Sequence, residues 1–98
     1  MAYICKIAVP ASWTSVETLI KTIDADFAFA EGKHYSLQAD SKYGIRICNT
    51  SSLPTDDEAG EHLADYQVAY FEPEDGATLY VKLRSPGYAA ALAVSELS

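Results

Sequence analysis

The sequence predicts a mainly β protein: an antiparallel β-sandwich or jelly-roll-like domain with one short N-terminal α-helix. Three observations support this. Apolar residues alternate in several short runs, residues typical of turns separate the runs, and the runs follow one another at short, regular spacing. Ninety-eight residues, about half of them hydrophobic, are enough for one core, so we expect a single domain over residues 1–98.

Residues 66–96 show the clearest strand pattern. Their alternating apolar residues predict a meander of three half-buried strands, and these residues are Val68, Tyr70, Leu79, Val81, Leu83, Leu92 and Val94. Glu72-Pro73-Glu74-Asp75-Gly76 predicts the first turn, with the glycine in the left-handed conformation. Ser85-Pro86-Gly87-Tyr88 predicts a type II turn, which favours Pro followed by Gly.

The N-terminal part predicts a strand and the helix. Tyr3 to Val9 alternates as a strand and ends at Pro10, and Ser12 is suited to be the N-cap of a helix that runs to Asp24. Its apolar residues at helical spacing, expected to face the core, are Trp13, Val16, Leu19, Ile20 and Ile23.

Two further runs, 34–39 and 45–50, are spaced like a hairpin around the turn 41–44. In the first, Tyr35, Leu37 and Ala39 share one face, and in the second, Ile45 and Ile47 point inward. The polar segment from Asn49 to about Leu63 predicts a loop. Thr55 and Glu58 have the spacing of a capping box, which suggests one helical turn inside it.

The two cysteines, Cys5 and Cys48, lie in apolar runs and are expected to be small buried thiols. A disulfide between neighbouring strands is the alternative, and it requires an oxidising compartment. The histidines, His34 and His62, are not at metal-ligand spacing with them, so we expect no metal site. His34 is expected to be a solvated strand residue.

The net charge is −7, from 7 basic and 14 acidic residues. This balance argues against binding nucleic acid through its phosphates and against binding an anionic membrane surface. The longest apolar run is far shorter than the roughly 20 residues of a membrane-spanning helix. No basic region precedes the apolar N-terminus, so we expect no signal peptide and synthesis in a cytoplasm.

Acidic residues dominate the segment between Asn49 and Val81, which contains no Lys or Arg. A solvated loop that favours solubility is the expected interpretation. A calcium site and a mimic of DNA phosphates are alternatives, although the segment does not match the EF-hand pattern.

Motifs for catalysis are lacking: the chain contains no G-x-S-x-G, no H-E-x-x-H and no Gly-rich phosphate loop. A nucleophile–base pair of Cys48 and His34 on neighbouring strands is the one alternative. We therefore expect no enzyme, no catalytic residue and no cofactor.

Tyrosines are the most suggestive residues for binding. The candidate protein-contact residues are Tyr66, Tyr70, Tyr80 and Tyr88, because tyrosine combines an apolar ring with a hydrogen-bonding group and is enriched at interfaces. One face of the run 88–94 is nearly all alanine. This face would admit a close neighbour, either the second sheet of the domain or another subunit.

Several segments resemble small structural proteins of tailed bacteriophages. They are Tyr35-Ser36-Leu37-Gln38, Gly44-Ile45-Arg46-Ile47, the acidic loop from Pro54 to Gly60, the run from Asp75 to Lys82, and Ala-Val-Ser-Glu at 93–96. The resemblance covers roughly residues 29–96. It implies a capsid decoration or cement protein that binds the major capsid protein or other virion proteins, located at the capsid surface and made in the host cytoplasm. It also implies a homo-oligomer, with a trimer as one form.

Two other functions stay open from the sequence. One is an acidic, phage-encoded inhibitor that mimics DNA and blocks a nucleic-acid-binding defence complex of the host. The other is a small carbohydrate-binding β-sandwich, in which surface tyrosines stack on sugars.

Overall fold

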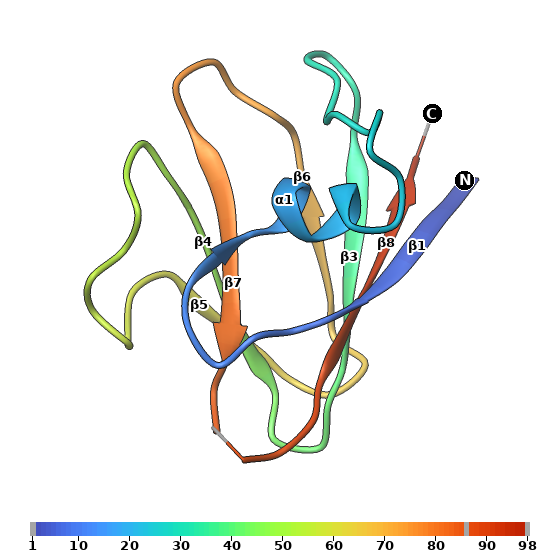
Figure 1. Cartoon of the computed structure of the whole chain (residues 1–98). Coiled ribbons are helices and arrows are strands. Elements are labelled where there is room, and N and C mark those ends of the chain that lie inside the picture. Colours follow the sequence, from blue (N-terminus) through green and yellow to red (C-terminus); the bar gives the residue numbers. More distant parts are fainter. Residues whose placement is uncertain (1, 86, 98) are drawn as a thin grey trace.

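A computed structural model of the chain describes residues 2–85 and 87–97. Two four-stranded antiparallel sheets pack face to face (Figure 1). Sheet A has the order β1 (Ala2–Ala8), β8 (Ala91–Glu96), β3 (Tyr35–Asp40), β6 (Val68–Phe71). Sheet B has the order β2 (Thr14–Ser15), β7 (Thr78–Leu83), β4 (Ile45–Thr50), β5 (Glu61–Leu63). With the short helix α1 (Val16–Lys21), this confirms the predicted β-sandwich.

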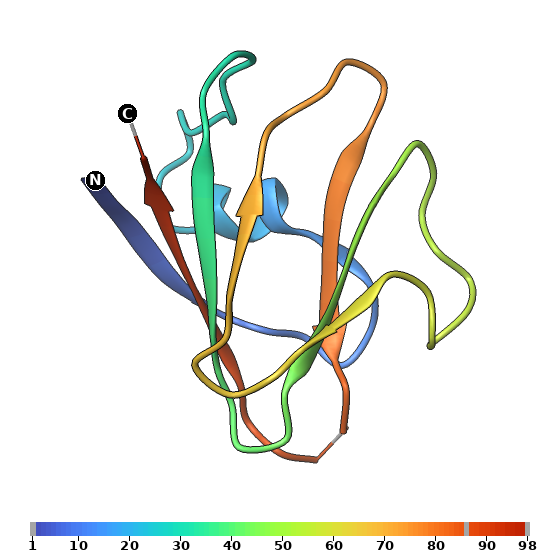
Figure 2. The same ribbon diagram turned by 180° about the vertical axis from the view of Figure 1, so that it is seen from behind.

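The predicted meander and hairpin are wrong, because the strands that they would join lie in opposite sheets. β6, β7 and β8 belong to sheets A, B and A, and β3 and β4 belong to sheets A and B. Figure 2 shows these connections crossing from one layer to the other. β8 instead lies between β1 and β3, and β7 lies between β2 and β4. Most strands therefore find their partners far away in the sequence. The exception is β5, which pairs with the preceding strand β4 and occupies the end of the segment predicted to be a loop.

The core consists of the side chains that the two sheets turn toward each other. The predicted inward residues Leu37, Ile47, Val81, Leu92 and Val94 are all buried. Tyr35, Ala39, Ile45, Leu79 and Leu83 are buried as well, also as predicted. These alternations are confirmed because a strand with one buried face places every second residue in the core.

β6 has the opposite phase to the prediction. Val68 and Tyr70 point outward and are exposed, whereas Phe71 is buried and Ala69 packs against the core. Phe71 contacts the ring of Phe29 edge to face, with ring centroids 5.0 Å apart. The run Val-Ala-Tyr-Phe has apolar residues on both faces, so its period allows either phase. The aromatic contact inside the sandwich selects the observed one.

The helix begins three residues later than predicted. Its N-cap is Ser15, whose hydroxyl accepts a hydrogen bond from the backbone N of Thr18 at 3.3 Å. Residues 14 and 15 pair with Val81 and Tyr80 as strand β2 and are therefore unavailable to a helix. Val16 and Ile20 face the core as predicted, but Ile23 lies beyond the helix and is exposed.

The predicted turns are supported where the structure describes them. Gly76 has φ +80°, and the N–H of Ala77 donates to the carbonyl of Glu74 at 3.2 Å. Gly87 has φ +101°, and the N–H of Tyr88 donates to Ser85 at 3.3 Å. Pro86, the other defining residue of the second turn, lies outside the described residues.

The cysteines are both free, so the disulfide alternative is wrong. Cys5 is buried, as expected, and Cys48 is half-buried. Cys5 belongs to sheet A and Cys48 to sheet B. Burial raises the pKa of the Cys5 thiol, which keeps it protonated.

Candidate functional site

The four predicted contact tyrosines do not form one group. Tyr70, on the edge strand β6, and Tyr66, in the loop before it, are exposed beside sheet A. Tyr80 is half-buried on β7 in sheet B. Tyr88 lies in the β7–β8 loop, with its ring centroid 4.1 Å from that of Tyr43. The structure therefore places Tyr66 and Tyr70 near one surface and separates Tyr80 and Tyr88 from it.

Strand register adds Tyr3 to this surface. In sheet A, Tyr3 is opposite Ser95, Ser95 is opposite Ser36, and Ser36 is opposite Tyr70. Residues directly opposite in neighbouring strands point to the same side of a sheet. The row thus begins and ends with an exposed tyrosine, across three interstrand steps of about 4.8 Å each.

We call the outward surface of sheet A the tyrosine face. Its strand residues are Tyr3, Lys6, Ser36, Gln38, Asp40, Val68, Tyr70, Ala91, Ala93 and Ser95. Tyr66, in the loop before β6, lies at its edge near Lys6. The middle of this face is formed by small side chains, among them the alanines of β8. The alanine-rich side of the last strand therefore faces outward, and Leu92 and Val94 are the residues that face the second sheet. The alternative that places the alanines against the second sheet is wrong.

An ion pair crosses the tyrosine face. The ammonium of Lys6 on β1 donates to the carboxylate of Asp40 on β3, over the intervening strand β8. This hydrogen bond, followed by the charge of Asp40, raises the pKa of Lys6, and Tyr3 and Tyr66 contribute in the same direction. The ammonium thus lies close to tyrosines from both edges of the sheet.

Tyr66 has an unusual backbone conformation. Among the residues that the structure describes, Tyr66 is the one residue other than glycine whose φ is positive, at +61°. Two bonds hold it: its N–H donates to the carbonyl of Ala39 at 2.8 Å, and its carbonyl accepts from the Gln38 amide at 3.1 Å. Strain of this kind persists where the surroundings fix the backbone. The phenol is consequently positioned at the edge of the tyrosine face.

Sequence reasoning missed Tyr3, because the apolar alternation of β1 predicts the opposite side of the strand for this residue. Cys5 and Ile7 point inward on β1, and a bulge between Tyr3 and Cys5 adds one residue to that strand. The bulge shifts the phase, so simple alternation would have placed Tyr3 in the core. Once the bulge is included, Tyr3 shares the outward side with Ser95.

The acidic loop 51–60 is bound to sheet B, so the prediction of a solvated loop holds only for its side chains. Arg46 donates to the carbonyl of Glu58 at 2.7 Å and to that of Gly60 at 3.1 Å. The Trp13 indole donates to the carbonyl of Asp56 at 3.0 Å. The capping-box prediction is wrong, since the carboxylate of Asp56 accepts from the N–H of Glu58 at 2.9 Å and forms a local turn.

The Cys48–His34 alternative fails because the two residues belong to different sheets. Cys48 lies on β4 in sheet B, whereas His34 directly precedes β3 in sheet A and its imidazole lies 3.4 Å from the carboxylate of Glu72. Within residues 2–85 and 87–97, no group of three His, Cys, Asp or Glu side chains is placed to hold a metal ion. In the same part of the chain, no helix is long and apolar enough to cross a bilayer.

Comparison of the chain with protein-family models, with curated proteins and with solved structures found no match.

Proposed function

We propose that this protein is a non-enzymatic binding protein whose tyrosine face docks onto a partner protein. The setting that we propose is the virion of a tailed bacteriophage. There the chain would act as a capsid decoration or cement protein, binding the major capsid protein or another virion protein as a homo-oligomer. The geometry supports the docking step, and the sequence resemblance supports the setting.

One observation carries the docking proposal. Three tyrosines of the same face are strongly exposed: Tyr3 and Tyr66 at 66% and Tyr70 at 75%. A tyrosine buried at an interface removes a large apolar ring from water while its hydroxyl keeps a hydrogen bond. Exposed aromatic residues around small side chains are therefore suited to bind a flat protein surface.

The middle of the face supports the same conclusion. Ala93 and Ser95 have short, half-buried side chains, so a partner backbone is able to approach closely between the tyrosines, whereas Ser36 is buried. The Lys6–Asp40 pair neutralises the two charges at the middle of the face. Interface centres are poor in unpaired charges and rich in tyrosine.

Co-sedimentation with purified capsids tests the proposal. We expect the wild-type protein to sediment with capsids and Tyr70→Ser to bind at least about tenfold more weakly, the usual effect at an aromatic hot spot. Tyr88→Ser is the matched control, because it removes an exposed tyrosine outside the tyrosine face, and it should bind like wild type. The absence of wild-type binding would refute the capsid setting, and equal loss in both variants would refute the role of this face.

A carbohydrate-binding β-sandwich is the second candidate, favoured by the same exposed rings. Sugars stack on flat aromatic rings, and Tyr3, Tyr66 and Tyr70 would supply such rings. A glycan array distinguishes the two candidates: binding that is lost in Tyr70→Ser but retained in Tyr88→Ser would establish the sugar function in place of the protein-docking one.

A further inference from the structure

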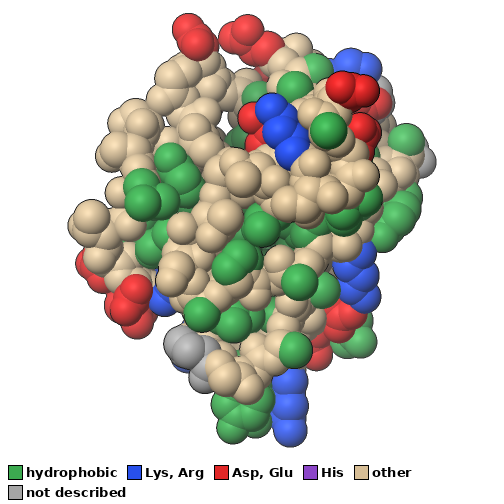
Figure 3. Space-filling view, in the orientation of Figure 1, with side chains coloured by type: hydrophobic (Ala, Val, Ile, Leu, Met, Phe, Trp, Pro, Cys, Tyr) green, Lys and Arg blue, Asp and Glu red, His purple; other side chains and the backbone are tan. Residues whose placement is uncertain are grey.

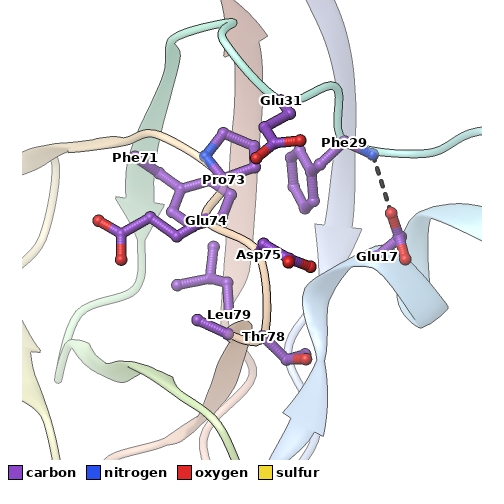
Figure 4. Close-up of a pocket in the computed structure, with 10 residues that line it drawn as sticks. Glu17, Phe29, Glu31, Phe71, Pro73, Glu74, Asp75, Thr78 and Leu79 are labelled. Atoms are coloured by element: carbon purple, nitrogen blue, oxygen red, sulfur yellow. Dashed lines mark hydrogen bonds between the residues drawn. The ribbon is translucent and has the colours of Figure 1, made fainter.

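A small cavity opens at one end of the sandwich, away from the middle of the tyrosine face. It lies between α1, the segment that leads into β3, and the β6–β7 turn, and its volume is about 190 Å³ (Figure 4). Phe29, Phe71 and Leu79 form its apolar wall. The carboxylates around it come from three separate segments, and they belong to Glu17, Glu31, Glu74 and Asp75.

Local contacts hold the cavity wall in place. The N–H of Phe29 donates to the Glu17 carboxylate at 2.8 Å, which ties the segment before β3 to the helix (Figure 4). The N–H of Ala30 donates to the Tyr35 hydroxyl at 2.9 Å. The Phe29 ring also packs edge to face on the rings of Tyr35 and Phe71, at 4.8 Å and 5.0 Å. Such a site is formed before any ligand arrives, which reduces the cost of binding.

The cavity has negative charge without a balancing cation. None of its lining residues is Lys, Arg or His, and Glu31, Glu74 and Asp75 are exposed. Among the described residues, these three carboxylates form no ion pair. Figure 3 shows acidic side chains at the tip of this end of the molecule, with Lys or Arg side chains farther toward the right of the view. An adjoining hollow shares Phe71, Glu74 and Leu79, and Glu61 and Glu72 add further carboxylates there.

The wall and the charge together select an organic cation. A metal ion needs several oxygen ligands directed at one point, and no such group exists among the described residues. The apolar wall favours a cation with a carbon body, and aromatic rings attract cations directly. A volume near 190 Å³ matches one side chain, because an apolar cavity of about 150 Å³ holds a benzene molecule.

We propose that this cavity binds an arginine side chain of a partner protein. The aliphatic stem would pack against Leu79 and Phe71, and the planar guanidinium would stack near Phe29. The head group would meet the carboxylates of Glu31 and Asp75, to which arginine presents a rigid fork of donors. A lysine side chain, with a compact and strongly hydrated charge, binds more weakly in such a site. This site is independent of docking through the tyrosine face.

The test is an NMR titration of the ¹⁵N-labelled protein with the peptide Gly-Ser-Arg-Ser-Gly, blocked at both ends. We expect saturable shifts of the amides of Phe29, Asp75, Gly76 and Thr78. Replacing the arginine by citrulline, which keeps the shape and removes the charge, should weaken binding about tenfold or more, the equivalent of 1.4 kcal/mol. Shifts spread evenly over the whole surface, or equal binding of both peptides, would overturn the proposal.

Matched variants distinguish specific binding in the cavity from attraction of the peptide by the net negative charge of the protein. Glu31→Gln with Asp75→Asn removes two charges from the cavity and should weaken the arginine peptide about tenfold or more. Glu58→Gln with Asp65→Asn removes two exposed charges outside the cavity and should leave the affinity unchanged. An equal loss in both double variants would show that net charge alone attracts the peptide and would overturn the site.

A third arm identifies the source of the cation. n-Butylguanidinium carries the same head group and stem without a peptide backbone. Binding of the peptide at least as tightly as n-butylguanidinium supports recognition of a partner protein. Binding of the small cation alone, with the peptide excluded, would assign the cavity to a free guanidinium compound and overturn the protein-partner proposal. Neither outcome depends on capsid binding, so this test and that of the tyrosine face fail separately.

Discussion

Lys82 on β7 lies almost completely buried beneath Asp57, with 3.2 Å between its Nζ and the carboxylate oxygen. The side chain of Lys82 is 6% exposed, whereas that of Asp57 is 82% exposed. Lys82 is directly opposite Arg46 in the sheet, so two cations lie side by side on the outer surface of sheet B. The loop 51–60 covers both, and its carbonyls and carboxylates balance their charge.

Removing the negative charge that pairs with Lys82 should destabilise the protein. Asp57→Asn leaves a buried ammonium opposite Arg46 without its charged partner, and we expect the free energy of unfolding to fall by about 1–2 kcal/mol, since Asp57 is itself exposed to solvent. Adding Lys82→Met should restore most of this loss, because an apolar side chain of similar length needs no partner. Urea denaturation of both single variants and the double variant measures the coupling; additive losses would contradict it.

Gly60 should be one of the residues least tolerant of substitution. It has φ +73°, and a Cβ there would collide with the carbonyl oxygen of Ile47 and lie 2.8 Å from the Cβ of Cys48. Gly32 also has positive φ, at +82°, but a Cβ there meets nothing within 4 Å. We expect Gly32→Ala to lower the free energy of unfolding by about 1 kcal/mol, because only the left-handed backbone is strained. Gly60→Ala should lower it by at least twice as much, as measured by urea denaturation. Similar losses would show that loop 51–60 shifts freely.

The two thiols should differ in reactivity. Cys5 is buried with a raised pKa, whereas Cys48 is half-buried on the outer side of β4. Because the thiolate is the reactive form, a thiol reagent at pH 8 should modify Cys48 at least about tenfold faster. Cys48→Ser should abolish the fast phase, and 8 M urea should expose both thiols in the wild type. A fast phase retained in Cys48→Ser would contradict the burial of Cys5.

The Lys6–Asp40 pair should give stability that depends on pH. Asp40 raises the pKa of Lys6 above its ordinary value of 10.5, so the folded protein holds this proton more tightly than the unfolded chain. The contribution is therefore complete below pH 10.5 and is lost as the pH rises through the higher folded-state value. Urea midpoints of wild type and Lys6→Gln should converge above pH 10.5. Because the pair is exposed, added salt should also narrow their difference at pH 7. A constant difference across this range would contradict the ion pair.

The buried pattern of single strands could be predicted from the sequence, but their pairing could not. Leu37, Ile47, Val81 and Leu92 are inward as alternation requires, since burial of one face imposes a period of two. A four-residue turn such as 41–44, however, serves equally to form a hairpin or to cross between sheets. The choice depends on which distant strand completes each sheet, and no local residue encodes it. β6 shows the same limit, because its phase is decided by the contact between Phe71 and Phe29.

The candidate site was predicted only in part for the same reason. The exposed positions of Tyr66 and Tyr70 agree with a role in contact, yet Tyr3 joins them only through the pairing of β1 with β8. The cavity near Phe29 is made by segments centred on residues 17, 29 and 75, which are distant in sequence. In the sequence, its carboxylates are therefore indistinguishable from unrelated surface charges.

The position of β8 between β1 and β3 has a consequence for synthesis on the ribosome. Ala91 to Glu96 pair with Ala2–Ala8 on one side and with Tyr35–Asp40 on the other, so the earliest strand is joined to its sheet by the last one. Until residues 91–96 leave the exit tunnel, sheet A lacks its second strand, and β1 has no hydrogen-bonding partner in that sheet. Sheet A is therefore completed only after residues 91–96 have been synthesised and have left the tunnel.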